Sequence, residues 1–420
     1  MTDPYTRRSV EEAVALVLDN VSTLEVEYVP VTESVGRVVA YDLTSNIDIT
    51  PFDNVAMDGF ALKADEVGCA SADAPVALKV VAEAPAGTLY EGPIGPGECV
   101  RIMTGAPLPP EADCMVQYEL VDHQGGDGHV GSVVLFTKPT KPGNNIRKKG
   151  EEIEAGATAI ARGETVSAAG VGFLASCGIT SVPVYCKPRV GVISIGSELV
   201  DPTEMPTAGK IRNSNGYALE ALALQAGGIP VHYEIVPDDL DALTAQVKAA
   251  TKECDFVVTS GGASNGDFDF IKPVIETAGT LLMTVVNMRP GKCQTFGLVN
   301  DTPVFGLPGN PAAAWCGFEI IVRQALRKMQ GYSSFARPVV KAHLALPLRK
   351  KNQRRMYLRA TLSRQDDKLV VTPAKNQSSG LFSTIQRGNC LIIKPDDGHE
   401  YEAGELIDVV LMDVAEGTVL

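Results

Sequence analysis

An alternation of apolar strands and helices between residues 188 and 331 constrains the fold of this chain more than any other feature. It starts at 189–195, a largely apolar run of the kind found in strands that are buried on both faces of a sheet. It continues through expected helices and strands, the helices at 214–226, 240–250, 270–277 and 311–330 and the strands at 231–236, 256–260 and 302–306. Strands and helices that alternate in this way predict a doubly wound parallel sheet.

Local signals mark where several helices begin and end. Asn310 and Pro311 are typical of the cap and first turn of the helix expected at 311–330, and Gly331 follows its end. Near the N-terminus, the run from Ser9 to Glu12 is a capping box, which predicts that a helix with an apolar face begins there.

Two further parts of the chain have the pattern of β-structure. Residues 51–144 are rich in Gly and Pro and carry short β-prone runs, which together predict a small β-domain. From about residue 336 short strand-like runs return and continue to the end of the chain. This second part predicts a C-terminal barrel or sandwich.

The charge of the chain restricts its partners. Its 420 residues include 51 acidic and 37 basic side chains, so the net charge is −14. An acidic surface repels phosphate backbones, which argues against nucleic acid as a partner. No apolar run reaches the roughly 18 residues that a membrane span needs, and residues 1–8 do not resemble a secretory signal. The nine cysteines are scattered, which is typical of reduced thiols in a cytoplasmic protein.

Acidic residues follow three of the expected strands in the 188–331 segment. They are Glu198, Asp238 and Asp269. Ligands of open α/β sheets bind beyond the carboxyl ends of the strands, so these three side chains are expected to converge on one crevice. Carboxylates that converge repel one another unless a cation lies among them, and hard oxygen ligands suit Mg²⁺. The alternative is that each acid only caps the helix that follows it.

Glycine-rich loops and basic clusters are the features that could hold an anion. Gly261-Gly262 and the loop 306–311 would let backbone N–H groups approach an anion closely, although ordinary turns explain them too. Basic clusters lie at 145–150, 288–292 and 349–355, and in so acidic a chain these are where phosphates or oxyanions are expected to bind. No Ser-His-Asp or Cys-His arrangement is evident, so catalysis is expected to depend on electrostatics, metal and positioning.

Several short motifs occur in order along the chain. They are PFDNVAMDGFA at 51–61, RIMTGAP at 101–107, NIR at 145–147, GSEL at 196–199, TSGG at 259–262, GDFD at 266–269, RPGK at 289–292 and GLPGNP at 306–311. Together they resemble the motifs of the MoeA/gephyrin E-domain family, the molybdopterin molybdenumtransferases of molybdenum-cofactor synthesis. The resemblance runs from about residue 9 to the end of the chain.

The resemblance implies a multidomain α/β plus β architecture with four domains. A discontinuous N-terminal domain would comprise 1–50 and 145–187, with a small β-domain inserted at 51–144. A doubly wound α/β domain similar to MogA would span 188–333, and a β-barrel domain would span 334–420. The family forms homodimers, which implies an active site at the subunit interface, between the α/β domain of one subunit and the inserted domain of the other.

The resemblance also implies the reaction and the residues that carry it. The family inserts molybdate, the metal-donor substrate, into adenylated molybdopterin with Mg²⁺ and releases AMP, and transient contact with the molybdopterin adenylyltransferase would supply the substrate. The acidic active-site set would be Asp58, Glu198, Asp238 and Asp269, of which the last three would bind the metal. The substrate contacts would be Thr104, Arg147, Arg289, Pro308, Pro311, Arg354 and Ser379.

The chain departs from the family pattern at a few positions. Ser197 stands where Asp is common, Val285 stands where some members carry Lys, and Arg289 replaces the usual Lys. Gln353 stands where Gly often precedes the arginine, which leaves the choice between Arg354 and Arg355 open. Molybdate and tungstate both remain as the oxyanion.

Two other functions remain as alternatives. One is a molybdopterin adenylyltransferase, because the α/β domain resembles the MogA-type fold, although the added β-domains and the motif around Asp58 favour the insertion enzyme. The other is a gephyrin-like scaffold, which the absence of a G-domain and linker disfavours.

Overall fold

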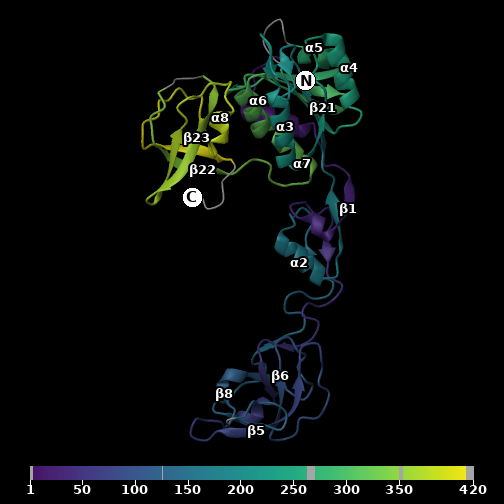
Figure 1. Ribbon diagram of the computed structural model, residues 1–420, viewed down its shortest axis with the longest axis vertical. Helices are drawn as coiled ribbons and strands as arrows, with labels where there is room; N and C mark the ends of the chain where they lie inside the picture. The colour runs from purple at the N-terminus through teal and green to yellow at the C-terminus, as the bar shows by residue number, and fades with distance from the viewer. Residues whose placement is uncertain (1–2, 125, 263–269, 350–352, 413–420) are drawn as a thin grey trace. The chain divides into compact units, whose positions relative to one another are not determined.

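The computed structural model describes residues 3–124, 126–262, 270–349 and 353–412 (Figure 1). The chain forms two compact units, one made of Met1–Glu27 and Pro183–Leu420 and the other of Tyr28–Val182. Strands β1 (Val26–Pro30) and β12 (Ser181–Tyr185) pair where the chain passes between the units. The finer division into four domains stays a prediction.

A six-stranded mixed sheet forms the centre of the first unit. In spatial order its strands are β16 (Ile229–His232), β13 (Arg189–Ser194), β17 (Phe256–Ser260), β21 (Thr302–Leu307), β20 (Cys293–Val299) and β18 (Gly279–Val285). The first four strands are parallel, which confirms the doubly wound α/β fold. Strands β20 and β18 were not predicted, and they run antiparallel at one edge of the sheet.

Helices cover both faces of this sheet (Figure 1). Helices α4 (Leu240–Ala250) and α5 (Ile271–Ala278) pack over one face, around Ile193 and Val257. The other face carries α3 (Ser214–Gln225) and the chain from Pro311 to Met329, which runs as α6 (Pro311–Gly317), a π-helical segment (Phe318–Val322) and α7 (Arg323–Met329). These bounds confirm the helices that were expected at 214–226, 240–250 and 311–330.

Helix α1 (Val10–Asp19) belongs to the core of the first unit. Ser9 and Glu12 form both bonds of the predicted capping box. Val10, Ala13 and Val17 are buried in the same apolar cluster as Val190 and Phe256 of the central sheet. The N-terminal helix therefore packs against the α/β part of the chain.

The C-terminal strands close into a barrel of five strands. They are β22 (Val339–Leu344), β23 (Arg355–Gln365), β24 (Lys368–Pro373), β25 (Cys390–Lys394) and β26 (Leu406–Leu411). Closure follows from the pairing of β23 with both β24 and β25, so the barrel alternative is confirmed over the sandwich. The short strand β19 (Met288–Arg289) leaves the α/β part and pairs with β23, and the single-turn helix α8 (Ser383–Gln386) precedes β25.

The second unit contains the predicted small β-domain. Its six-stranded sheet has the order β7 (Cys114–Gln117), β4 (Gly59–Leu62), β6 (Glu98–Ile102), β5 (Val76–Ala84), β9 (Val133–Phe136) and β8 (Val121–Asp122). The same unit holds helix α2 (Ala168–Ser176) and two short strand pairs, β2 (Leu43–Thr44) with β11 (Thr158–Ile160) and β3 (Asn54–Val55) with β10 (Ile146–Arg147). None of the helices in the described residues is long and apolar enough to cross a membrane.

Candidate active site

The carboxyl ends of three parallel strands lie side by side in the first unit. Ser194 of β13 is paired with Ser260 of β17, and Ser260 is paired with Leu307 of β21. The loops that follow each strand therefore begin at one edge of the sheet. This is the edge at which the strand-end argument places a ligand site.

The loops that carry two of the predicted acids, Glu198 and Asp238, are joined at this edge through Ser197. The backbone N–H of Ser197 donates to Asp238 Oδ2 at 2.9 Å, and the backbone N–H of Asp238 donates to Ser197 Oγ at 3.0 Å. Glu198 is the next residue, and its carboxylate folds back over Gly196, where an added Cβ would lie 2.4 Å from Glu198 Oε2. Asp269, the third predicted acid, lies outside the described residues.

The chemistry of these two acids fits Mg²⁺. A protein usually binds Mg²⁺ through one or two carboxylates together with substrate phosphates and water. One oxygen of Asp238 is engaged by Ser197, which fixes the side chain and leaves its other oxygen to coordinate. No group of three or more metal-ligating side chains occurs among the described residues, so the remaining ligands would have to come from the substrate, water or the segment that contains Asp269.

The glycine loop after β17 makes a close backbone contact with the end of β13. Gly261 has φ +90°, and a Cβ there would lie 2.2 Å from the backbone oxygen of Ile195. Gly309 approaches from the loop after β21, and its Cβ position lies 3.7 Å from Gly261 Cα. Only a residue without a side chain allows the β13 and β17 ends to approach so closely.

Asn215, in the first turn of α3, is a residue of this edge that was not predicted. Its amide nitrogen donates to Ser260 Oγ at 2.7 Å and to the Gly309 carbonyl at 2.9 Å. Its Oδ1 is buried and has no hydrogen-bond partner within the described structure. An unpaired buried acceptor is costly, which favours a role in binding a ligand donor. The run Asn213-Ser214-Asn215 directly before a helix was the available signal.

A cavity of about 900 Å³ lies in the same unit, between this edge and the barrel. Three of the predicted substrate contacts line it: Arg289, Pro308 and Ser379. It is also lined by four further cations, Lys292, Arg349, Arg359 and Lys394, while no carboxylate occurs in the described part of its lining. Of these cations, Arg349 is ion-paired with Glu402. A cavity of this charge is suited to an anion.

Arg354 and Pro311 do not belong to the described lining of this cavity. Arg354 is half-buried, and Pro311 opens α6 beside Asn310, which does line the cavity. Arg355, the alternative to Arg354, forms an ion pair with Glu11 of α1. Through that ion pair, Arg355 contributes to the contact between the barrel and the N-terminal helix.

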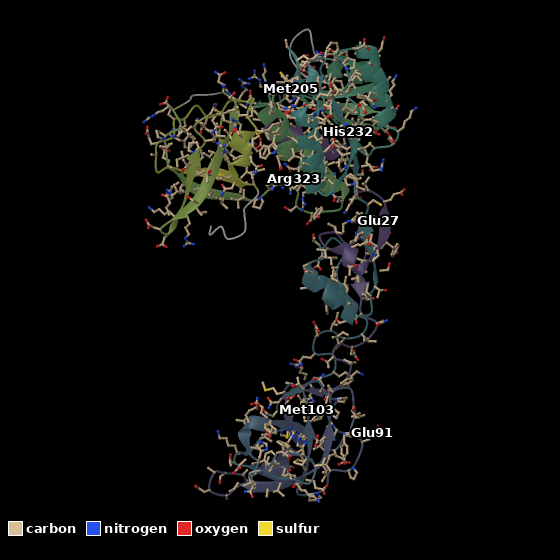
Figure 2. The ribbon with its side chains drawn as sticks, in the orientation of Figure 1. Glu27, Glu91, Met103, Met205, His232 and Arg323 are labelled. Carbon is tan, nitrogen blue, oxygen red and sulfur yellow. The ribbon has the colours of Figure 1, made fainter. Side chains whose placement is uncertain are left out.

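In the second unit, Asp58 and Thr104 form one hydrogen-bonded group. Asp58 Oδ1 accepts from the backbone N–H of Thr104 at 2.8 Å and from its hydroxyl at 2.7 Å. These two bonds, helped by the charge of Arg101, hold the pKa of the Asp58 carboxyl below its ordinary value. Thr104 follows Met103, which is labelled in Figure 2.

Arg147 is the cation of its cluster that makes no ion pair with a described residue. Lys148 Nζ lies 2.7 Å from Asp53 Oδ2, and Lys149 Nζ lies 3.2 Å from Asp48 Oδ2. Arg147 itself is exposed on β10, beside the motif strand β3. Of the three basic side chains, it is therefore the best suited to meet an anion.

Comparisons with known proteins agree with the motifs. Residues 8–178 match the family model of the MoeA N-terminal region (domain I and II). Residues 191–328 match the model of a probable molybdopterin binding domain, and residues 341–412 match the MoeA C-terminal region (domain IV).

Whole-length relatives show the same similarity. The chain is 35% identical over 419 residues to the molybdopterin molybdenumtransferase of Bacillus subtilis (strain 168), covering 100% of this chain and 97% of that protein. It is 33% identical over 414 residues to the molybdopterin molybdenumtransferase of Staphylococcus aureus (strain COL), covering 98% and 97%. The crystal structure of the molybdopterin biosynthesis moeA protein from Pyrococcus horikoshii OT3 superposes with a TM-score of 0.82 at 30% identity, covering 97% of this chain and 100% of that one.

Proposed function

The chain belongs to the MoeA family, and from this premise we propose that it is a molybdopterin molybdenumtransferase of molybdenum-cofactor biosynthesis. The observation that carries the proposal is the 900 Å³ cavity lined by five cations and, in its described part, by no carboxylate. An acidic chain that keeps such a cavity beside the carboxyl ends of its strands is suited to an anionic substrate. Molybdate is a dianionic oxyanion of that kind.

In the first unit, the cavity residues and the acids at the strand ends would have different roles. Arg289, Lys292 and Ser379 would bind and orient molybdate in the cavity, because cations and a hydroxyl match the charge and the oxygens of the ion. Glu198 and Asp238 would hold Mg²⁺ at the strand ends. When bound, that metal would neutralise phosphate charge on adenylated molybdopterin.

The second unit would supply the rest of the substrate site. Asp58, which accepts two hydrogen bonds from Thr104, and the exposed Arg147 offer one negative and one positive group. We propose that the protein is a cytoplasmic homodimer in which these residues of one subunit complete the site of the other. Transient contact with the molybdopterin adenylyltransferase would then deliver adenylated molybdopterin, and AMP would leave after molybdate is inserted.

The length of the match favours this function over its alternatives. A molybdopterin adenylyltransferase of the MogA type would need only the α/β part, whereas the matches extend through both β-rich parts of the chain. A scaffold like gephyrin would not require a cationic cavity whose described lining contains no carboxylate.

The proposal is tested by incubating the protein with adenylated molybdopterin, molybdate and Mg²⁺. AMP release and formation of active cofactor are expected to depend on all three additions, and EDTA is expected to stop both. Active cofactor is measured by reconstitution of a molybdenum apoenzyme. If AMP and cofactor fail to form under saturating conditions, the function is wrong. Adenylation of free molybdopterin from ATP would instead support the adenylyltransferase.

A further inference from the structure

A row of polar side chains ends one face of the six-stranded sheet in the second unit. Arg101 of β6 is paired with Glu83 of β5 on one side and with Phe60 of β4 on the other. Side chains directly opposite each other in paired strands lie on the same face. Asp58 stands two residues before Phe60, and its carbonyl accepts from the Tyr118 backbone N–H at 3.0 Å, which extends the pairing of β4 with β7. Asp58 therefore lies on this face, diagonally across from Arg101.

The guanidinium of Arg101 is fixed on this face by the loop between β8 and β9. Its Nη1 donates to the Asp127 carbonyl at 2.8 Å. Its Cζ lies 5.1 Å from the centroid of the Tyr118 ring, whose hydroxyl donates to the same carbonyl at 3.3 Å. A cation is attracted to an aromatic ring at this distance. The carbonyl and the ring therefore hold the positive charge in one place.

Glu83, the second carboxylate of the row, is already engaged. Its Oε1 lies 2.7 Å from His129 Nδ1 and accepts from the Val130 backbone N–H at 3.3 Å. The hydrogen bond with His129, helped by the charge of Arg101, holds the pKa of the Glu83 carboxyl below its ordinary value. Arg101 itself forms no ion pair with a described residue. Asp58 is therefore the carboxylate of this row that has an oxygen left for a ligand.

The surroundings of that oxygen favour a neutral donor over a metal ion. Thr104 gives both of its hydrogen bonds to Asp58 Oδ1, and no described residue donates to Oδ2. A divalent cation bound at Oδ2 would be repelled by the fixed guanidinium of Arg101. A neutral N–H group carries no such penalty. Adenylated molybdopterin offers such groups, because its pterin and adenine rings both carry N–H donors.

We infer that Asp58 Oδ2 binds a ring N–H group of adenylated molybdopterin and no metal ion, and that Arg101 is the positioning residue that balances its charge from the same face. The inference rests on the proposed function, since that function supplies the substrate. It separates the acids of the protein by ligand. Glu198 and Asp238 would bind the metal, and Asp58 would bind the organic substrate.

Asp58→Asn separates the two kinds of ligand. Thr104 would hold the amide oxygen, so an N–H group would replace Oδ2 and face the donor of the substrate. The KM for adenylated molybdopterin is expected to rise about tenfold. The Mg²⁺ concentration that gives the half-maximal rate is expected to stay within about twofold, whereas Glu198→Gln, the comparison variant, should raise it. A higher Mg²⁺ requirement in Asp58→Asn with an unchanged KM would overturn the inference.

Inhibition by AMP, the proposed product, identifies the ring. If Asp58 binds the adenine, Asp58→Asn is expected to raise the inhibition constant of AMP about tenfold together with the KM. If Asp58 binds the pterin, the KM rises and the inhibition constant stays within about twofold. Both results support an N–H contact. An unchanged KM together with an unchanged inhibition constant contradicts it.

Arg101→Met tests the positioning role. Without the cation, the pKa of Asp58 is expected to rise in a carbon-detected NMR titration, and the KM for adenylated molybdopterin should rise with it. Arg101→Lys keeps the charge and should restore both values. Lys63→Met removes an exposed cation at the other end of β4 and is the matched control, which should change neither.

The titration needs no turnover, so its result is independent of the proposed function. The role of Arg101 is wrong if Asp58 titrates in Arg101→Met as it does in the wild type, or if Arg101→Lys restores neither value. It is also wrong if Arg101→Met lowers the melting temperature and raises the KM without moving the pKa of Asp58, because that result indicates a structural role alone. A wild type that releases no AMP would instead overturn the proposed function.

Discussion

At the scale of the residue, Asp58 shows how hydrogen bonds lower the pKa of an exposed carboxyl group. It is exposed, yet Thr104 donates two hydrogen bonds to one of its oxygens. Donors stabilise the charged form, so its pKa lies below the ordinary value. The two bonds also hold the charged side chain in one direction.

Removing the Thr104 hydroxyl is expected to raise the pKa of Asp58. Thr104→Val keeps the backbone donor but loses the side-chain donor, so the carboxylate is stabilised less. The acid limb of the pH–rate profile should move to higher pH. Above pH 7 the raised pKa should have little effect on the rate, because Asp58 is ionised there in both proteins. Carbon-detected NMR titration of Asp58 measures the shift directly. Thr104→Ser, which retains the hydroxyl, should titrate like the wild type, and an unchanged pKa in Thr104→Val would contradict the assignment.

The residues of the site differ in how far the sequence alone could reveal them. Glu198 and Asp238 were predicted because each directly follows a strand, and strand ends of a parallel sheet share one edge. Asn215 was not, because its role depends on partners 45 and 94 residues away in the chain.

At the scale of the element, the approach of β13 to the loop after β17 depends on Gly261. Gly261→Ala would impose a left-handed backbone on a residue with a side chain, at a cost of about 1–2 kcal/mol. It would also press Cβ against the Ile195 carbonyl, which adds about 1–3 kcal/mol of overpacking. We expect urea denaturation to show both losses together with reduced turnover.

Gly209→Ala is the matched control for that substitution. Gly209 has φ +78°, but no atom lies within 4 Å of its Cβ position. It should therefore lose only the backbone component of the free energy of unfolding. Equal losses in the two variants would show that the contact with Ile195 is not important.

Elements with local start and stop signals were predictable, and those without were not. The predicted bounds of α3, α4 and the α6–α7 segment agree with the structure, because the residues that cap or end each helix lie next to it in the sequence. Strands β18 and β20 were missed because polar residues interrupt their pattern, including Gln294, which is fully buried in β20. The strand expected at 231–236 begins earlier and ends at His232, since beyond it only Val236 bridges to Ile195.

At the scale of the whole molecule, a buried ion pair secures the chain between α7 and the barrel. Arg337 donates to both carboxylate oxygens of Glu319 at 2.7 and 2.9 Å, and the Glu319 side chain is 1% exposed. Arg337→Met would leave a buried carboxylate without this partner and is expected to lower the free energy of unfolding by about 3–5 kcal/mol. The double variant Glu319→Gln/Arg337→Met should recover part of the loss. The denaturation midpoint of the double variant is therefore expected to be higher than that of Arg337→Met. Equal midpoints in the two variants would contradict the argument.

Mixed subunits test whether one active site draws on two copies of the chain. Asp58 lies in the second unit and Glu198 in the first. Asp58→Asn and Glu198→Gln should each reduce turnover by about 100-fold, because each removes a charge proposed to act in the active site. The fold does not need either charge, so both variants should stay folded. If the site is shared between subunits, a mixed dimer contains one doubly altered site and one intact site. Random reassociation of equal amounts should then restore about one quarter of wild-type activity, since about half of the dimers are mixed. Sites built within a single subunit would give no recovery, because every site would then carry one of the two substitutions.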